Sequence, residues 1–160
     1  MRKILEFVSL AALALLVGMT TAALAGAHRL PDRVPTHFDA AGQANAWGSP
    51  RALLALPIVA LALYVLMTVV SRHPSVFNFP VRVTSANRSR LEGLALEMIA
   101  WLKAEVLCLF AWIQSMTIEL ARSGQGRLSP WFMPVTLGAV FATIVWYVAA
   151  MRRAGRALRD

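Results

Sequence analysis

The run "FVSLAALALLVGMTTAALA", residues 7–25, contains no charged side chain over 19 positions. A helix rises about 1.5 Å per residue, so about 20 residues cross the hydrocarbon core of a bilayer, which is about 30 Å thick. Two further uncharged runs of sufficient length follow at residues 52–71 and 128–151. The chain is 58% hydrophobic and 15% charged, with a mean hydropathy of +0.60. These features predict a protein that folds in a membrane.

The first run has a second interpretation. A basic start at Arg2 and Lys3 and an Ala-x-Ala ending at Ala25 are typical of a cleaved signal peptide. The uncharged part is longer than the usual apolar region of about 7–15 residues in such a peptide. We therefore expect a retained helix, with cleavage as the alternative.

A fourth candidate span, residues 96–119, carries charges. Glu97, Lys103, Glu105 and Glu119 interrupt it, and only residues 106–118 are free of charge. Glu97 and Glu119 lie 22 positions apart, which is about 33 Å along a helix. One carboxylate would therefore lie at each of the two membrane interfaces. The prediction is a single all-α integral membrane domain, residues 1–160, with four transmembrane helices at about 5–25, 52–71, 96–119 and 130–151. An ordered external loop, 26–51, follows the first helix, and a cytoplasmic loop covers 72–92.

Basic residues set the orientation, because cytoplasmic loops are enriched in Lys and Arg. With four spans, ten basic residues fall on one side: Arg2, Lys3, Arg72, Arg82, Arg88, Arg90, Arg152, Arg153, Arg156 and Arg159. Five fall on the other: Arg29, Arg33, Arg51, Arg122 and Arg127. Both termini are therefore predicted to be cytoplasmic, in a bacterial inner membrane. This asymmetry explains the net charge of +8 without nucleic acid as a partner.

The predicted external loop is rich in turn residues. Pro31 and Pro35 favour extended backbone at Leu30 and Val34. Gly42 and Gly48 are expected where the backbone turns with positive φ. A connection of this length is more than two helices need, and long ordered loops are usually functional.

The loop resembles the signature of a bacterial membrane family of unknown function, domain family 1648: Leu-Pro-x-x-Val-Pro-x-His-Phe-x-x-x-Gly, followed by Trp-Gly. The matching positions are Leu30, Pro31, Val34, Pro35, His37, Phe38, Gly42, Trp47 and Gly48. The stretch "HPSVFNFPVRVTSANRSR" is similar to the family's second loop at Asn78, Pro80, Thr84 and Asn87. The module is also similar to the N-terminal part of immunity proteins that protect sporulating bacteria from a secreted killing factor. Their C-terminal membrane domain has no counterpart in this sequence.

His37 leaves three roles open. It either holds the loop through a side-chain hydrogen bond while Phe38 packs on helix ends, or it recognises an external peptide or lipid head group, or it binds a divalent cation together with His28, Asp32 and Asp39. The spacing matches no metal motif. We favour the first role and predict no metal.

The polar residues of the third span need partners, because a charge at the bilayer centre costs about 2.5–3.5 kcal/mol on insertion scales. At 100° per residue, one face carries Glu97, Glu105, Cys108, Trp112, Ser115 and Glu119, and another carries Lys103, Phe110 and Gln114. The glutamate face is expected to point into the bundle, and Lys103 to extend to the cytoplasmic interface. A proton relay through Glu105 and recognition of a membrane partner are the alternatives. Ser89 and Glu92 predict a capping box at the start of this helix.

The sequence contains no motif of a hydrolase, metalloprotease or nucleotide-binding enzyme. We therefore expect no enzyme and no cofactor, but a binding module of immunity or signalling type that acts through its external loop. The partners would be the bilayer and a secreted peptide or another membrane protein. A small transporter or permease subunit that uses the third-span carboxylates is one alternative, and a structural subunit of a membrane complex is another. The oligomeric state stays open.

Overall fold

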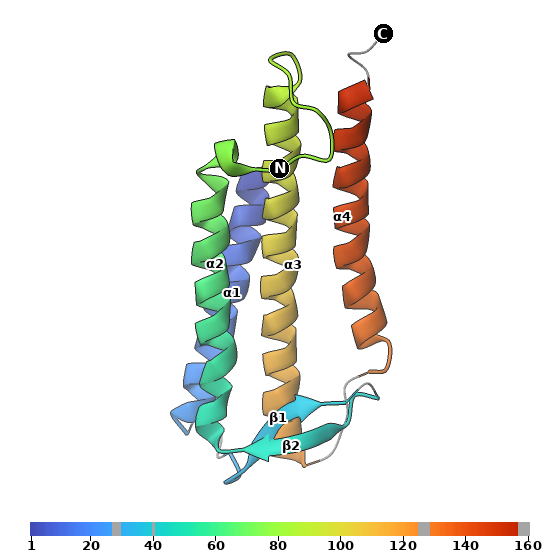
Figure 1. The fold of residues 1–160 in the computed structure, drawn as a ribbon. Helices are drawn as coiled ribbons and strands as arrows, with labels where there is room; N and C mark the ends of the chain where they lie inside the picture. Colours follow the sequence, from blue (N-terminus) through green and yellow to red (C-terminus); the bar gives the residue numbers. More distant parts are fainter. Residues whose placement is uncertain (27–29, 40, 125–128, 157–160) are drawn as a thin grey trace.

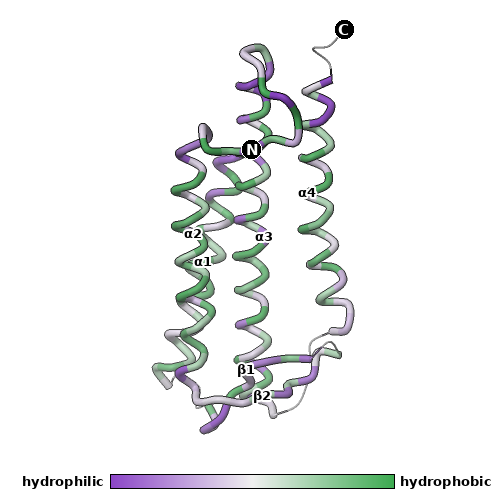
Figure 2. Tube along the Cα trace, in the orientation of Figure 1, coloured by the Kyte–Doolittle hydropathy of each residue, from purple (hydrophilic) through white to green (hydrophobic). Residues whose placement is uncertain are grey.

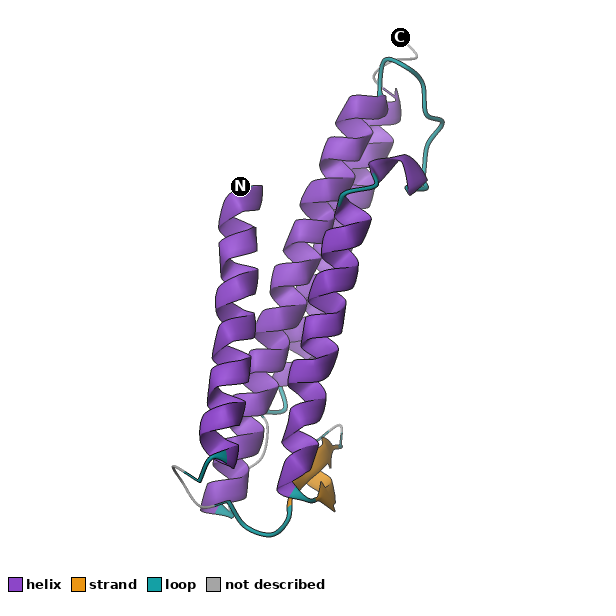
Figure 3. Cartoon of the chain, turned by 90° about the vertical axis from the view of Figure 1, so that its left-hand side faces the viewer, coloured by secondary structure: helices purple, strands orange, loops and turns teal. Residues whose placement is uncertain are grey.

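A computed structural model describes residues 1–26, 30–39, 41–124 and 129–156. Four long helices lie side by side: α1 (Arg2–Leu24), α2 (Ala55–Ser71), α3 (Arg88–Ser123) and α4 (Phe132–Arg156) (Figures 1 and 3). Two 3₁₀ turns, η1 (Pro50–Leu54) and η2 (Pro74–Val76), flank α2. The fold is therefore mostly helical, as predicted. It is not all-α, because strands β1 (Val34–Phe38) and β2 (Ala44–Gly48) form an antiparallel hairpin between α1 and α2.

Helix α3 is the centre of the bundle and lies against each of the other three helices. Its contact with α1 and α2 is built from Leu16, Ala60, Leu107 and Ala111, all of them buried. Alanine at such positions lets two helix backbones approach closely, which strengthens van der Waals packing where lipid surrounds the helices. The central position explains why the helix with the most charges is also the one with the most neighbours.

Three helical segments are long and apolar enough to cross a membrane: Arg2–Leu24, Pro50–Ser71 and Phe132–Arg156. Figure 2 shows mostly hydrophobic residues along these helices, with hydrophilic residues at their upper ends. Large apolar side chains such as Phe7, Leu61 and Phe141 are more than half exposed on the outside of the bundle. An outward apolar surface of this kind is what a lipid environment requires. Helix α3 is not among the three segments.

One end of the bundle extends beyond α1 and α2. Helix α3 has 36 residues, about 54 Å, which is longer than a bilayer core. Its start and the end of α4 project past the ends of α1 and α2 (Figure 1). There the chain between η2 and α3 packs Phe77, Phe79 and Val81 against a small core of α3 and α4 residues. We call this region the extended end.

A helix was expected to start near Ser89, and α3 does so, but its capping differs from the prediction. The helix begins at Arg88, so its first turn lies inside the stretch 72–92 that was predicted as a loop. The expected capping box between Ser89 and Glu92 is wrong: the Glu92 carboxylate instead accepts a bond from Arg88 Nε at 2.9 Å, one turn away. The helix ends at Ser123 and is capped by Gly124, whose φ of 64° is a left-handed conformation that glycine adopts without strain.

Candidate functional site

The hairpin is anchored on the bundle by one end of β1. Val34 and Pro35 are buried, and Val34 joins a core cluster with Ala23, Leu53 and Ile118 from three other elements. Leu30 packs against the same cluster, whereas Pro31 is exposed. This contact fixes the hairpin relative to α1 and α3. The extended backbone expected before each proline therefore becomes a strand rather than an irregular loop.

A tight turn closes the hairpin at Asp39. One oxygen of its carboxylate accepts bonds from the backbone N–H groups of Ala41 and Gln43, each 2.9 Å long. Gly42 has a φ of 77°, as predicted. The side-chain bonds of Asp39 replace the backbone bonds that a turn leaves unmade.

Gly48 serves a different purpose from the one predicted, because it has no positive φ. A Cβ atom at this position would lie 2.8 Å from Cγ2 of Thr36. Thr36 belongs to β1 and Gly48 to β2, so a side chain here would push the two strands apart. The expectation of a left-handed backbone at Gly48 was wrong. The glycine is required for close approach of the strands.

The outer part of the hairpin presents polar and aromatic side chains to solvent. His37 is exposed, and its Nδ1 atom lies 2.6 Å from Oδ1 of Asn45 on the facing strand. Trp47 is 42% exposed, and its carbonyl accepts a bond from Arg33 at 3.0 Å. Phe38 is half-buried. We call the exposed set Thr36, His37, Asn45 and Trp47 the hairpin strip.

The residues considered for a metal do not gather in the part of the chain that is described. There, no group of three or more His, Cys, Asp or Glu side chains is placed to hold an ion. Asp39 is committed to the turn, Asp32 is exposed, and His28 lies outside the described residues.

Lys103 is buried in the bundle, with 5% of its side chain exposed. Its Nζ atom donates to Oε2 of Glu6 at 2.6 Å and to Oγ1 of Thr68 at 3.1 Å, and lies 4.7 Å from the ring centre of Tyr64. The Tyr64 hydroxyl donates to the other Glu6 oxygen at 2.5 Å. Lys103 is thus paired inside the bundle, near the start of α1 and the end of α2, and its extension to the cytoplasmic interface stays a prediction. Its partner is a residue just before the first apolar run, which the sequence reasoning missed.

Gln114 makes the second polar contact between α3 and its neighbours. Its amide nitrogen donates to Oγ1 of Thr20 at 2.8 Å and to the Leu53 carbonyl at 2.9 Å. Thr20 in turn donates to the carbonyl of Leu16. Gln114 is fully buried, and its two amide hydrogens are both used in these bonds, one to α1 and one to η1. Lys103 and Gln114 thus tie α3 to α1 and to the chain around α2.

The glutamates of α3 face in two directions. Oε1 of Glu105 accepts a bond from Thr143 at 2.6 Å, and Glu97 accepts one from Tyr147 at 3.4 Å. Both partners are on α4, which agrees with the expected orientation into the bundle. Glu119 is exposed, so the expectation fails there. The second Glu105 oxygen is buried and has no hydrogen-bond partner. It lies beside a cavity of about 160 Å³ between α3 and α4.

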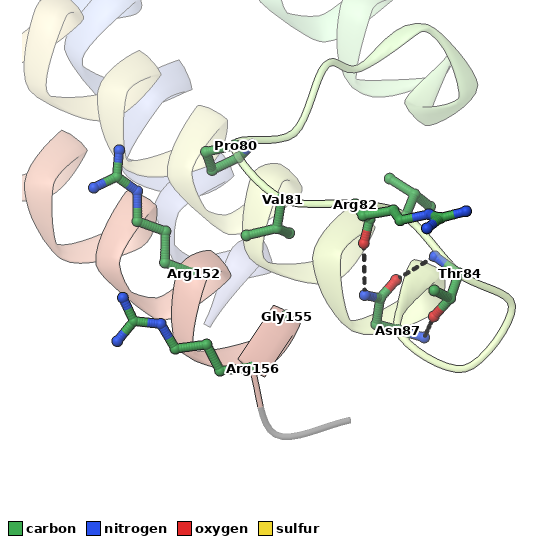
Figure 4. A pocket seen from close by; sticks show the side chains of 9 residues that line it. Pro80, Val81, Arg82, Thr84, Asn87, Arg152, Gly155 and Arg156 are labelled. Atoms are coloured by element: carbon green, nitrogen blue, oxygen red, sulfur yellow. Dashed lines mark hydrogen bonds between the residues drawn. The ribbon is translucent and has the colours of Figure 1, made fainter. Parts of the chain in front are cut away.

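Asn87 organises the extended end (Figure 4). Its side-chain oxygen accepts the Thr84 backbone N–H at 2.8 Å, and its amide nitrogen donates to the Arg82 carbonyl at 3.0 Å. The Thr84 hydroxyl oxygen in turn accepts a hydrogen bond from the Asn87 backbone N–H at 3.3 Å. Pro80 and Asn78 are exposed. In Figure 4 the guanidinium groups of Arg152 and Arg156 lie on the opposite side from that of Arg82. The pocket of about 790 Å³ that these residues line therefore has no converging charges.

The apolar helices and their internally paired polar side chains define a membrane-type helical protein with a hairpin at one end. Residues 14–61 match the family model described as Domain of unknown function (DUF1648). The matched residues run from α1 through the hairpin into α2, and the resemblance to this family is confirmed over this part of the chain. No curated protein and no solved structure matches the chain.

Proposed function

We propose that the chain is a four-span inner-membrane protein with both termini in the cytoplasm. The pairing of the α3 charges supports the fourth span: Lys103 is neutralised by Glu6, and Glu97 and Glu105 accept bonds from α4. Polar side chains within membranes face the bundle interior and pair with one another. The ten-to-five distribution of basic residues supports this orientation, in which the hairpin is outside the cytoplasm.

The protein acts by binding an external ligand through the hairpin strip. The observation that carries this proposal is a hairpin held by Val34 on the bundle and by Asp39 at the turn, with the side chains of the hairpin strip exposed to solvent. A tryptophan beside a hydrogen-bonding pair is a typical composition of a binding surface. The likeness to immunity proteins supports a secreted peptide as the ligand, and therefore self-protection or signalling as the role.

Conditioned medium tests this role. A deletion strain should grow poorly in medium in which the parent strain has grown, and the wild-type gene should restore growth. His37→Ala with Trp47→Ala should not restore growth, although the protein reaches the membrane in normal amounts. Arg51→Ala, an exposed position outside the hairpin, is the matched control and should restore it. A deletion strain that tolerates the medium rejects self-protection, and full rescue by the double variant rejects the hairpin strip.

One observation favours a second function, transport through the α3–α4 contact. The Glu105 oxygen without a partner adjoins a cavity lined by Cys108, Trp112 and Thr136. A buried carboxylate oxygen readily binds a cation or accepts a hydrogen bond from a protonated substrate. A buried acceptor that forms no hydrogen bond costs free energy. If transport is the activity, Glu105→Gln abolishes it and leaves growth in conditioned medium unchanged. If Glu105→Gln leaves transport unchanged and the hairpin variant fails to restore growth, the function is assigned to the hairpin.

A further inference from the structure

A second cavity lies between α1, α2 and α3, next to the Lys103–Glu6 pair. It has a volume of about 210 Å³ and is lined by Arg2, Glu6, Arg72, Leu96, Ala100 and Lys103, among others. These residues come from the start of α1, the end of α2 and the early part of α3. Figure 1 places the start of α1 and the end of α2 at the same end of the bundle. The cavity is therefore close to one membrane surface, below the extended end.

The charges around this cavity do not balance. Lys103 and Glu6 neutralise each other across 2.6 Å, which leaves Arg2 and Arg72. Within residues 1–26, 30–39, 41–124 and 129–156, neither arginine forms an ion pair. Two exposed arginines, one at the start of α1 and one directly after α2, thus line the same cavity without an ion-pair partner. Guanidinium is the side chain that best matches phosphate, through paired N–H donors in a planar fork.

The remaining wall is partly apolar: Leu96 and Ala100 on α3 line the cavity, together with Thr68 and Ser71 on α2. The cavity is smaller than the 300–1,000 Å³ or so of a pocket that encloses a whole organic ligand. A site near the membrane surface that is lined by both cationic and apolar side chains matches a molecule that is anionic at one end and hydrocarbon at the other. Basic pockets between membrane helices bind the head groups of anionic lipids for this reason.

We propose that this cavity binds the phosphate group of an anionic phospholipid, with Arg2 and Arg72 as the phosphate ligands. Leu96 and Ala100 contact the glycerol and the first acyl carbons, and the Lys103–Glu6 pair forms the floor. Glu6 also lines the cavity and repels an anion, but its charge is held by Lys103 and by the Tyr64 hydroxyl. The site is independent of the hairpin. Only its assignment to the inner leaflet rests on the proposed topology.

The test measures lipid retention on the purified full-length protein by native mass spectrometry. Detergent micelles are supplied with phosphatidylglycerol or with phosphatidylcholine of the same acyl chains, and a third sample receives inorganic phosphate alone. We expect phosphatidylglycerol to be retained in preference to phosphatidylcholine, and retention to fall by about tenfold in the variant with Arg2→Gln and Arg72→Gln. Arg90→Gln, at an exposed position at the same end of the molecule and outside the cavity, is the control for the loss of one charge, matched to the single Arg72→Gln variant, and should retain the lipid.

Arg72→Lys keeps the charge and guards against a folding defect, and should retain more lipid than Arg72→Gln. Equal retention of the two lipids, or an equal loss in Arg90→Gln, overturns the proposal. Equally strong retention of inorganic phosphate, abolished by the same double variant, overturns the lipid assignment. A positive lipid result together with normal growth of the hairpin variant rejects only the proposed function, so the two proposals fail separately.

Discussion

The buried pair between Glu6 and Lys103 should respond very unequally to removal of its two partners. At a separation of 2.6 Å, two unit charges attract by about 6 kcal/mol at an effective dielectric constant of about 20, before the cost of desolvation is subtracted. The two side chains are desolvated to different extents: 5% of the Lys103 side chain is exposed but 39% of the Glu6 side chain. The free energy lost on breaking the pair therefore depends on which charge is left behind.

Glu6→Gln leaves the Lys103 ammonium buried with Thr68 and the Tyr64 ring as its remaining partners. An uncompensated buried charge costs about 3–5 kcal/mol. Lys103→Met leaves Glu6, which reaches water and still accepts the Tyr64 bond, so we expect a loss of about 1 kcal/mol. The double variant should be close to Lys103→Met, because it leaves no charge unpaired and Met fills a similar volume. The magnitude of the coupling energy is then about 3–5 kcal/mol, the full cost of Glu6→Gln.

The free energy of unfolding is measured by titration with sodium dodecyl sulfate in mild detergent micelles, with tryptophan fluorescence as the signal. Glu119→Gln, an exposed charge on α3, is the control and should change stability by no more than about 0.5 kcal/mol. The reasoning is refuted if Glu6→Gln is no more destabilising than Lys103→Met, or if the effects of the two substitutions simply add.

Two further predictions concern the hairpin and the topology. Gly42→Val should lower the stability of the hairpin by about 1–3 kcal/mol, because a β-branched side chain is strained at its φ of 77°; the yield of folded protein after detergent extraction measures this, and an unchanged yield contradicts it. Fusions of a periplasm-active phosphatase should be active at Gln43 and Gly124 and inactive at Ser75 and Asp160, and activity at Ser75 would contradict the four-span topology.

The features that were predictable are those that depend on short segments of the chain. The apolar runs located α1, α2 and α4, because crossing a bilayer requires about 20 uncharged residues in sequence. The left-handed backbone at Gly42 was predictable for a similar reason, since φ is a local preference. The hairpin itself was not predicted, because strand pairing depends on how β1 and β2 meet across the turn. The same is true of Gly48, whose glycine is required by Thr36 of the other strand.

The partners of the α3 side chains could be found only from the packed helices. The sequence by itself determined that Lys103 lies in an apolar stretch and needs a partner, because a lone charge is costly there. It could not identify Glu6, which is 97 positions away, since several acidic residues were available and the rotation of each helix in the bundle was unknown. The tertiary structure decided the pairing: α3 sits at the centre, so one of its faces meets α1 and α2 while another meets α4. Hydropathy is a property of each segment, whereas a contact between side chains requires two segments to be placed in space, and only the packing of the four helices does that.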